Sequence, residues 1–454
     1  MNTLPTNAGD VTRRDFIRGS SVATLMTLLG GVELKAAAPR NAEGKELIGP
    51  KVKLAVIGLG PWGREILSTL QRIPEADITA ICDNYPSMLR RSAGNVPGAK
   101  AVDDYRAIVD DKDIQAVLVA TPTHQHKEIV LAALQAGKHV YCEAPLANSI
   151  DDAKAIARAA RDAVGQVFQS GLCMRSDPQR NFLLSFVRSG AVGRFLMARA
   201  QWHKKQSWRL TSPNPEREKA INWRLSRDTS LGLVGEVGIH QLDAITWFLR
   251  GLPKAVTGWG DVLCWPDGRN VPDTIQAVFE YPDGVQSMYD AMLSNSFDAD
   301  YEMLYGVNAA IMQRAAKSWL FKEVDSPLLG WEVYAKKDVF YKETGIALVA
   351  DATKSEKQTA DVVEEPPYSR TILAFAMENF LTNVGLVAGA VDDYKETFGS
   401  IDKTALAKQI AELTMSAAAG WKEGLEATVT VIKANEAVNE RKRIEFKKEW
   451  FELG

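Results

Sequence analysis

Three glycines near the start of the chain have the spacing of a phosphate-binding turn. Gly58, Gly60 and Gly63 form a GxGxxG pattern at the end of the apolar run 51–58. The first glycine permits a tight turn, the second lets the backbone approach a pyrophosphate, and the third allows close helix–strand packing. N–H groups at the start of the following helix attract phosphate oxygens. The residues predicted to contact a dinucleotide here are Gly58, Gly60, Pro61, Trp62 and Gly63.

An acidic residue follows at the distance that this kind of site requires. Asp83 lies 25 residues after Gly58 and directly follows a second apolar run, with Asn84 beside it. A carboxylate at this place accepts hydrogen bonds from the ribose hydroxyls and repels a 2′-phosphate. The arginines nearest in sequence, Arg90 and Arg91, fall on the next predicted helix. The pattern therefore predicts that the cofactor is NAD and not NADP, with Asp83 and Asn84 in its site.

Two further loops carry polar side chains at the ends of predicted strands. The first contains Thr121, Pro122, His124 and His126, and the second begins with Glu143 and Ala144. Ligands bind at the carboxyl ends of strands in an open α/β sheet, so we predict that both loops lie beside the cofactor. In the alternative, Pro122 merely ends its strand and the two histidines face solvent.

Glu236 and His240 form a possible acid–base pair. They stand four residues apart on a helix predicted from about 236 to 250, so they would share one face. Histidine titrates near neutrality and suits proton transfer to or from a substrate hydroxyl, and the carboxylate could orient the ring or relay the proton. In the alternative, the acid only complements the helix dipole and the histidine is packed.

An aromatic and basic stretch lies between the two halves of the chain. Tryptophan faces with arginine and histidine donors suit the apolar ring faces and hydroxyl rims of sugars. A core strand with a solvated basic loop is the alternative. The predicted substrate residues are Arg175, His203, Trp223 and Arg224.

Alternation of apolar runs and helical patterns predicts the fold that positions these residues. Strand, helix and strand in series indicate a doubly wound parallel sheet. From Phe195 onward strands dominate, and Pro282-Asp283-Gly284 predicts an antiparallel hairpin. The fold class is thus α/β, with an N-terminal Rossmann-type sheet and a C-terminal α+β domain holding an open, largely antiparallel sheet. The strands predicted for the first domain are 51–58, 77–82, 116–121, 139–144 and 166–171.

The predicted domain boundaries follow from the same pattern. Residues 39–171 form the cofactor domain, and 172–454 form a substrate and oligomerisation domain. Helices predicted at 370–383 and 401–420 belong to the second domain and can pack back on the first.

Composition excludes several classes of protein. The chain has 454 residues, 46% of them hydrophobic, and a formal charge of −3, so no basic excess exists to hold nucleic acid. The four cysteines lack the spacing of a disulfide framework or a metal site, and we expect them to be small buried side chains. No metal is predicted, and no apolar run after the N-terminal region is expected to span a membrane.

The N-terminal region predicts export. Arg13 and Arg14 precede an apolar stretch from Ser20 to Val32, which is too short to span a bilayer, and Ala36-Ala37-Ala38 follows. This order resembles a twin-arginine (Tat) signal peptide over 1–38 and predicts a periplasmic or otherwise exported protein. No cysteine follows the apolar stretch, so no stable membrane anchor is predicted.

The motifs as a set resemble the Gfo/Idh/MocA family. They are GLGPWG, CD, TPTHQH, AGKHVYCEAP and GEVGIHQLD, and they extend over nearly all of the chain after the signal. The resemblance implies an NAD(P)-binding domain, a C-terminal sheet that serves as the face of a homo-oligomer, and sugar or polyol substrates. It also implies that His240 is the general base of an Asp-x-x-x-His pattern, with Glu236 in place of the aspartate.

One position departs from the family. The family's usual triplet is Glu-Lys-Pro, in which the lysine touches the nicotinamide ribose and the reacting hydroxyl, whereas this chain has Glu143-Ala144-Pro145. Exported NAD-dependent glycosidases that resemble the family also lack the lysine. Three functions therefore remain: a sugar oxidoreductase with internally recycled NAD, a redox-neutral glycosidase or lyase, and a catalytically reduced carbohydrate-binding protein that keeps NAD.

Overall fold

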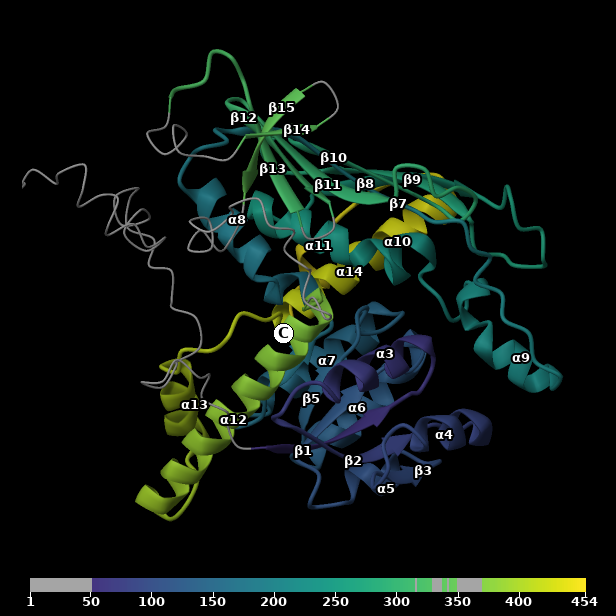
Figure 1. The fold of residues 1–454 in the computed structure, drawn as a ribbon, viewed down its shortest axis with the longest axis vertical. Coiled ribbons are helices and arrows are strands. Elements are labelled where there is room, and N and C mark those ends of the chain that lie inside the picture. The colour runs from purple at the N-terminus through teal and green to yellow at the C-terminus, as the bar shows by residue number, and fades with distance from the viewer. Residues whose placement is uncertain (1–50, 315–316, 329–336, 341–342, 349–369) are drawn as a thin grey trace, which may run out of the picture.

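The computed structural model places two β-sheets in one molecule, with helices between and beside them (Figure 1). It describes residues 51–314, 317–328, 337–340, 343–348 and 370–454. The predicted signal peptide over 1–38 lies outside the described residues.

The first sheet is parallel throughout and has the strand order β3-β2-β1-β4-β5-β6. This confirms the Rossmann-type sheet predicted from the sequence. Its strands are β1 (Val52–Ile57), β2 (Ala76–Cys82), β3 (Lys100–Val102), β4 (Ala116–Val119), β5 (His139–Cys142) and β6 (Phe168–Ser170). Its helices are α3 (Pro61–Leu70), α4 (Pro86–Ala93), α5 (Arg106–Val109), α6 (His126–Gln135) and α7 (Ile150–Asp162).

Both faces of this sheet are covered, partly by helices from the end of the chain. Alternate residues of β1 face opposite layers. Leu54 packs in a cluster with Ile66 of α3 and Phe380 of α12 (Ile372–Phe398), whereas Ala55 belongs to a cluster with Val429 of α14 (Trp421–Glu440). The continuous apolar runs of the strands follow from this double burial.

The second sheet has the strand order β14-β15-β13-β12-β11-β7-β10-β9-β8-β16. Every neighbouring pair is antiparallel except β7 with β10, which is parallel. The predicted hairpin joins β9 and β10. The strands are β7 (Phe195–His203), β8 (Ala255–Asp261), β9 (Thr274–Glu280), β10 (Gln286–Met292), β11 (Asp300–Gly306), β12 (Ala309–Arg314), β13 (Lys317–Lys322), β14 (Lys337–Phe340), β15 (Glu343–Leu348) and β16 (Arg443–Glu445).

Helices cover one face of this second sheet and separate it from the first domain (Figure 1). Among the described elements, no helix covers the opposite face. The covering helices are α8 (Pro178–Arg188), α10 (Gly232–Glu236), α11 (Gly238–Leu249) and α14, and a short α9 (Pro215–Ile221) projects toward α4.

Three helix predictions were wrong in extent. The helix predicted over 236–250 is interrupted at Val237, whose φ of −125° and ψ of −48° separate α10 from α11. The helix predicted over 370–383 continues to Phe398. The helix predicted over 401–420 is only α13 (Lys403–Ala411), and α14 was not predicted.

The expectation that all four cysteines are buried also needs correction. Cys82, Cys142 and Cys173 are buried, but Cys264 is exposed. One helix in the described part of the chain, α12, is long and apolar enough to cross a membrane by length and composition. Half of its most apolar stretch is buried, and Leu373, Met377 and Phe380 pack against the first sheet, so it serves as a core helix here.

Candidate functional site

The glycine turn after β1 brings helix α3 against the strand. A Cβ added at Gly63 would lie 1.9 Å from the Gly58 carbonyl oxygen, so only glycine permits this approach. Gly58 has a φ of +95°, a backbone conformation that favours glycine. A Cβ at Gly60 would meet no atom within 4 Å, so the backbone there is open to a ligand. The turn therefore has the form that a pyrophosphate site requires.

Asp83 holds this turn together from the end of β2. Its Oδ2 accepts a hydrogen bond of 2.8 Å from the Leu59 N–H, and its Oδ1 accepts one of 2.8 Å from the Tyr85 N–H. Each carboxylate oxygen can still accept a second hydrogen bond. The predicted ribose contact is thus compatible with a structural function of the same side chain, and Asn84 beside it is exposed.

Three buried polar atoms at the ends of β4 and β5 have no hydrogen-bond partner among the described residues. They are Thr121 Oγ1, His124 Nδ1 and Glu143 Oε1. Unpaired buried polar atoms cost free energy, and such atoms are characteristic of sites completed by a ligand. Together with the glycine turn and Asp83, they fit a bound dinucleotide along this edge of the sheet.

Glu143 is the most unusual of these groups. Burial raises its pKa to about 7, while the nearby polar groups of Trp62, Tyr141 and the Ala144 backbone favour the charged form and limit the rise. Gly171 lies so close that a Cβ there would be 2.6 Å from Glu143 Oε2. The carboxyl group is therefore confined beside Ala144, the position where the family carries a lysine.

The imidazole of His126 makes contacts within the protein, between the loops that follow β4 and β5. Its side chain is buried, with Nδ1 3.0 Å from the Pro145 carbonyl oxygen and Nε2 2.9 Å from the Thr121 carbonyl oxygen. Burial lowers its pKa, so the neutral ring donates to one of these carbonyls. Contrary to the prediction, His126 has no ring nitrogen left for a cofactor and instead joins the loops that follow β4 and β5. Pro122, next to Thr121, is half-buried.

A hydrogen bond joins the cofactor domain to the second domain beside these loops. Thr123 Oγ1 donates to Glu236 Oε2 at 3.0 Å, and Glu236 Oε1 accepts from the Leu231 N–H at 3.0 Å. Burial raises the pKa of Glu236, and the nearby positive charge of Arg224 opposes that rise. Both carboxylate oxygens are thus engaged, and Val237 separates Glu236 from the helix that carries His240. The predicted shared helix face does not exist.

His240 is the third residue of α11 and is half-buried. Burial, and then the positive charge of Arg180, lower its pKa to about 4. Its ring is therefore neutral at pH 7 and is a weaker base than a free imidazole. Gly238, at the start of the helix, lies against Tyr289, where a Cβ would be 2.8 Å from the ring. This contact fixes the start of α11 on the sheet.

Trp223 and Arg224 lie where the two domains meet. The ring of Trp223 is 6.2 Å from that of His124. The Arg224 guanidinium is 4.7 Å from the Trp223 ring centroid and 5.8 Å from that of Trp208. The structure thus brings two of the predicted substrate residues beside the predicted cofactor loop.

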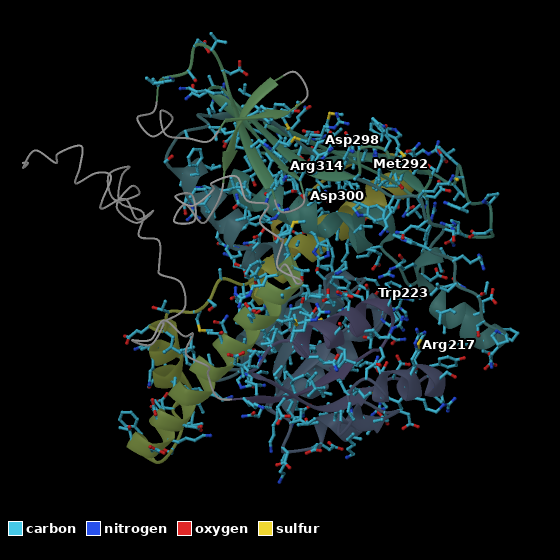
Figure 2. All side chains as sticks on the ribbon, viewed as in Figure 1. Arg217, Trp223, Met292, Asp298, Asp300 and Arg314 are labelled. Atoms are coloured by element: carbon cyan, nitrogen blue, oxygen red, sulfur yellow. The ribbon has the colours of Figure 1, made fainter. Side chains whose placement is uncertain are left out.

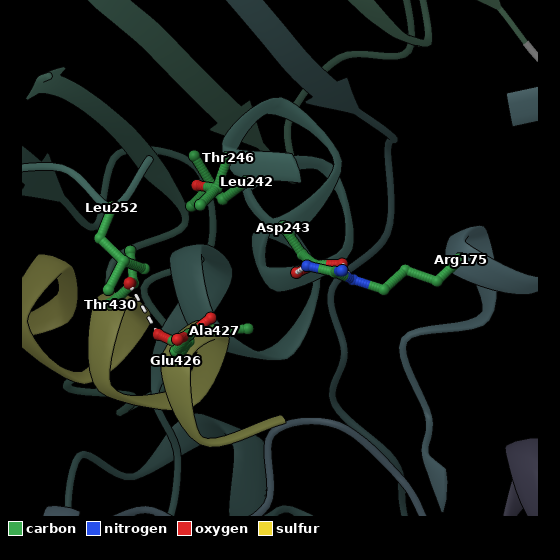
Figure 3. Close-up of a pocket in the computed structure, with 8 residues that line it drawn as sticks. All are labelled: Arg175, Leu242, Asp243, Thr246, Leu252, Glu426, Ala427 and Thr430. Carbon is green, nitrogen blue, oxygen red and sulfur yellow. Dashed lines mark hydrogen bonds and ion pairs between the residues drawn. The ribbon is translucent and has the colours of Figure 1, made fainter. Parts of the chain in front are cut away.

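Arg175 and His203 are not brought to this place. Arg175 donates two hydrogen bonds, of 2.9 Å and 2.8 Å, to the buried carboxylate of Asp243. Figure 3 shows this pair in a small pocket, with Glu426 and Thr430 of α14 on the opposite side. His203 Nε2 is 2.6 Å from Asp290 Oδ2, and both side chains lie on the face of the second sheet away from α11. Neither predicted substrate contact is supported by these positions.

Sequence reasoning missed three residues at the domain boundary. Thr123 was not predicted to have a function, although its place between Pro122 and His124 puts it in the predicted cofactor loop. Tyr85 follows Asp83 by two residues, and this short distance in sequence could have placed it near the predicted ribose contact. Arg217, whose guanidinium is 4.1 Å from the Tyr85 ring centroid, contacts a partner 132 positions away in sequence, and no local pattern indicates that pairing. In the described part of the chain, no cluster of three metal-ligating side chains occurs.

Two family models match the chain. The model described as "Oxidoreductase family, NAD-binding Rossmann fold" covers residues 52–170, and the one described as "GFO/IDH/MocA C-terminal domain" covers 183–309. Together they cover more than half of the chain, and the first identifies the parallel-sheet domain as NAD-binding.

Individual relatives share about a quarter to a third of their residues with this chain over the regions that align. Levoglucosan dehydrogenase of Pseudarthrobacter phenanthrenivorans is 31% identical over 164 residues, 36% of this chain and 40% of that enzyme. The 2,7-anhydro-N-acetylneuraminate hydratase of Escherichia coli is 26% identical over 274 residues, 59% of this chain and 69% of that enzyme. A solved structure of levoglucosan dehydrogenase with NADH and levoglucosan superposes with a TM-score of 0.65 at 17% identity, covering 87% of this chain and 99% of that one. At this low sequence identity, the superposition shows a shared fold and nothing further.

We predict that Glu143 makes stability depend on pH. Its pKa in the folded chain is about 7, above the ordinary value of 4.5, so the unfolded chain ionises first as pH rises. The free energy of unfolding should therefore fall between about pH 4.5 and pH 7, by up to about 3 kcal/mol. Urea denaturation of the protein and of Glu143→Gln across this range checks the effect. An identical pH dependence in the two proteins would contradict it.

Proposed function

Because the chain belongs to the Gfo/Idh/MocA oxidoreductase family, we propose that it is an exported NAD-dependent enzyme acting on a sugar, polyol or glycoside. Its cofactor stays bound and is oxidised and reduced within one catalytic cycle. The observation that carries this proposal is the set of unpaired buried atoms of Thr121, His124 and Glu143 at the carboxyl ends of β4 and β5. Trp223 and Arg224 then supply an aromatic and cationic surface suited to a sugar.

In this proposal, His240 transfers a proton and Glu236 positions the site beside the bound cofactor. Bound NAD would supply a hydride acceptor at the carboxyl edge of the first sheet. His240 is neutral at pH 7 and accepts the proton of the substrate hydroxyl, although burial makes it a weaker base than a free imidazole. Glu236 acts as a positioning residue, since its carboxylate is bonded to Thr123 and to the Leu231 backbone.

Export and cofactor retention support each other in this proposal. The predicted signal peptide would carry the protein out of the cytoplasm, where free NAD is scarce. A cofactor released there could not be replaced readily, so a productive cycle must end with NAD restored. Oxidation of one sugar followed by reduction of another satisfies this requirement.

Ala144 favours a second candidate, a redox-neutral glycosidase or lyase. Without the family lysine, nothing at this position donates to the reacting hydroxyl, and the methyl side chain leaves room for a leaving group. In such an enzyme, a hydride passes from a sugar hydroxyl carbon to bound NAD, and the carbonyl formed acidifies the neighbouring C–H so that the glycosidic oxygen is eliminated. In a glycosidase, water then adds to the double bond, whereas a lyase keeps it, and return of the hydride to the carbonyl restores NAD. The hydratase relative is named for a reaction that adds water, which is compatible with chemistry beyond simple dehydrogenation. A carbohydrate-binding protein that keeps NAD with reduced catalysis is the remaining alternative.

We also propose a homo-oligomer formed through the open face of the second sheet. Met197, Trp259 and Met288 on that face are 37%, 49% and 46% exposed. Apolar side chains grouped on one exposed face are typical of an association surface. No nucleic acid partner and no stable membrane anchor belong to this proposal.

Replacement of His240 tests the proposed function. His240→Asn should leave NAD bound, as measured by nucleotide released on denaturation, and lower turnover of a sugar or glycoside panel about 10²- to 10⁴-fold. Turnover is measured without added NAD, so that only a retained cofactor supports it. Wild-type protein that releases no NAD would remove the cofactor part of the proposal, and unchanged turnover in His240→Asn would remove the general base.

Ala144→Lys distinguishes the first candidate from the second. We expect the lysine to block activity on the true substrate, because it fills space that a leaving group needs. Ala144→Met, which adds similar length without charge, is the matched control and should block as well. If the lysine instead raises dehydrogenase activity with simple sugars, the glycosidase candidate is wrong.

Export is tested by the twin arginines. Replacing Arg13 and Arg14 by lysine should retain the precursor in the cytoplasm, because the twin-arginine pathway requires that pair. Fractionation of cells producing each form gives the result. Continued export of the lysine variant would show that a different signal operates.

A further inference from the structure

One segment of the second domain lies along the cofactor edge of the first sheet. We call residues 204–229 the arm; it leaves the end of β7, contains α9 and returns toward α10. In Figure 1 the arm projects from the second sheet toward α4, and Figure 2 shows Arg217 and Trp223 on that side of the molecule.

The arm contacts the first domain at three loops. Arg217 lies over the Tyr85 ring, after β2, at 4.1 Å. Trp223 lies 6.2 Å from His124, after β4. Further along, the Asp228 carbonyl oxygen accepts a 3.2 Å hydrogen bond from the Asn148 side chain, after β5. These loops follow three strands of one parallel sheet, so the contacts run along the edge where a dinucleotide binds.

The arm has a defined shape, because polar contacts hold it internally and to its own domain. Arg209 Nε is 3.0 Å from Asp267 Oδ2, and Arg209 Nη1 is 3.6 Å from Glu218 Oε1. The Asn222 side chain accepts from the Leu210 N–H and donates to the Leu210 carbonyl oxygen, both at 2.8 Å. The position of Arg217 is thus set by the arm and does not depend on Tyr85 alone.

Arg217 has a hydrogen-bond donor at this boundary that is unpaired within the described part of the chain. Its Nε is buried and has no partner among the described residues, while the face of the guanidinium lies against Tyr85. A stacked guanidinium keeps its N–H donors in the plane of the group, where they can reach a phosphate or ribose oxygen. Tyr85 stands two residues after Asp83, so this donor lies at the adenosine end of the site.

We propose that the arm is a clasp which retains NAD, and that Arg217 and Tyr85 are its fastening at the adenosine end. This inference rests on the proposed NAD-dependent function and adds the residues of the second domain that hold the cofactor. Release of the nucleotide then requires the Arg217–Tyr85 contact to break. Slow release is what an exported enzyme with a recycled cofactor needs.

The test measures how fast the nucleotide leaves the mature protein. Protein loaded with NADH is mixed with excess NAD, and the loss of nicotinamide fluorescence gives the dissociation rate. Arg217→Ala should raise that rate about tenfold, the size expected for a partly buried cation–π contact. Lys219→Ala, an exposed residue of the same helix with the same charge change, is the control and should release NADH like the wild type.

Two further variants separate the contact from a general effect on the fold. Tyr85→Phe keeps the ring and should release NADH slowly, whereas Tyr85→Ala loses the ring contact and should release NADH faster than the wild type, though no faster than Arg217→Ala, which loses its hydrogen-bond donors as well. The double variant should release NADH no faster than Arg217→Ala, because the ring contact that Tyr85→Ala removes is already lost in Arg217→Ala. Equal release by Arg217→Ala and Lys219→Ala would overturn the clasp while leaving the proposed function intact. Wild-type protein that binds no NADH would overturn both.

Discussion

The hydrogen bond from Thr123 to Glu236 is the contact on which the candidate site depends. It joins the loop after β4 to the last residue of α10, and α11 with His240 follows one residue later. The bond matters because Glu236 is partly buried, and the loss of a hydrogen-bond donor to such a carboxylate would lower the stability of the folded protein. The position of the proposed base relative to the cofactor loop is therefore set by a contact between the domains.

Glu143 and Ala144 give this site a character different from that of a lysine-bearing relative. A buried carboxyl group with a pKa of about 7 stands next to a methyl side chain, and neither brings a positive charge. The cations at the domain boundary come instead from Arg224 and Arg217, which lie over aromatic rings. The positive charge of Arg224 and Arg217 at this boundary thus comes from the arm of the second domain.

The sequence was most informative where the signals are local. The glycine turn, Asp83 and the buried strands depend on backbone sterics and periodicity, so their positions agree with the structure. The interruption at Val237 was missed because Glu236 and His240 have helical spacing. In the structure, Glu236 is bonded to Thr123 at the end of α10, whereas His240 lies on the separate helix α11. The end of α12 and the start of α13 carry local signals that the prediction did not use, because Gly399 ends α12 in the left-handed conformation and the Asp402 side chain caps α13. His203 and Arg175 look like sugar ligands by type, yet each is engaged by a carboxylate distant in sequence.

The parallel pairing of β7 with β10 has a consequence for how this architecture can diversify. Parallel neighbours cannot be joined by a hairpin, so the chain must make a long crossover between them, and the arm is the first part of that crossover. A crossover tolerates changes in length, because the register of β7 and β10 is set by the strands themselves. Insertions or deletions in the arm can therefore alter what covers the cofactor edge without disturbing either sheet, which makes this segment an evolutionary and engineering variable separable from the fold.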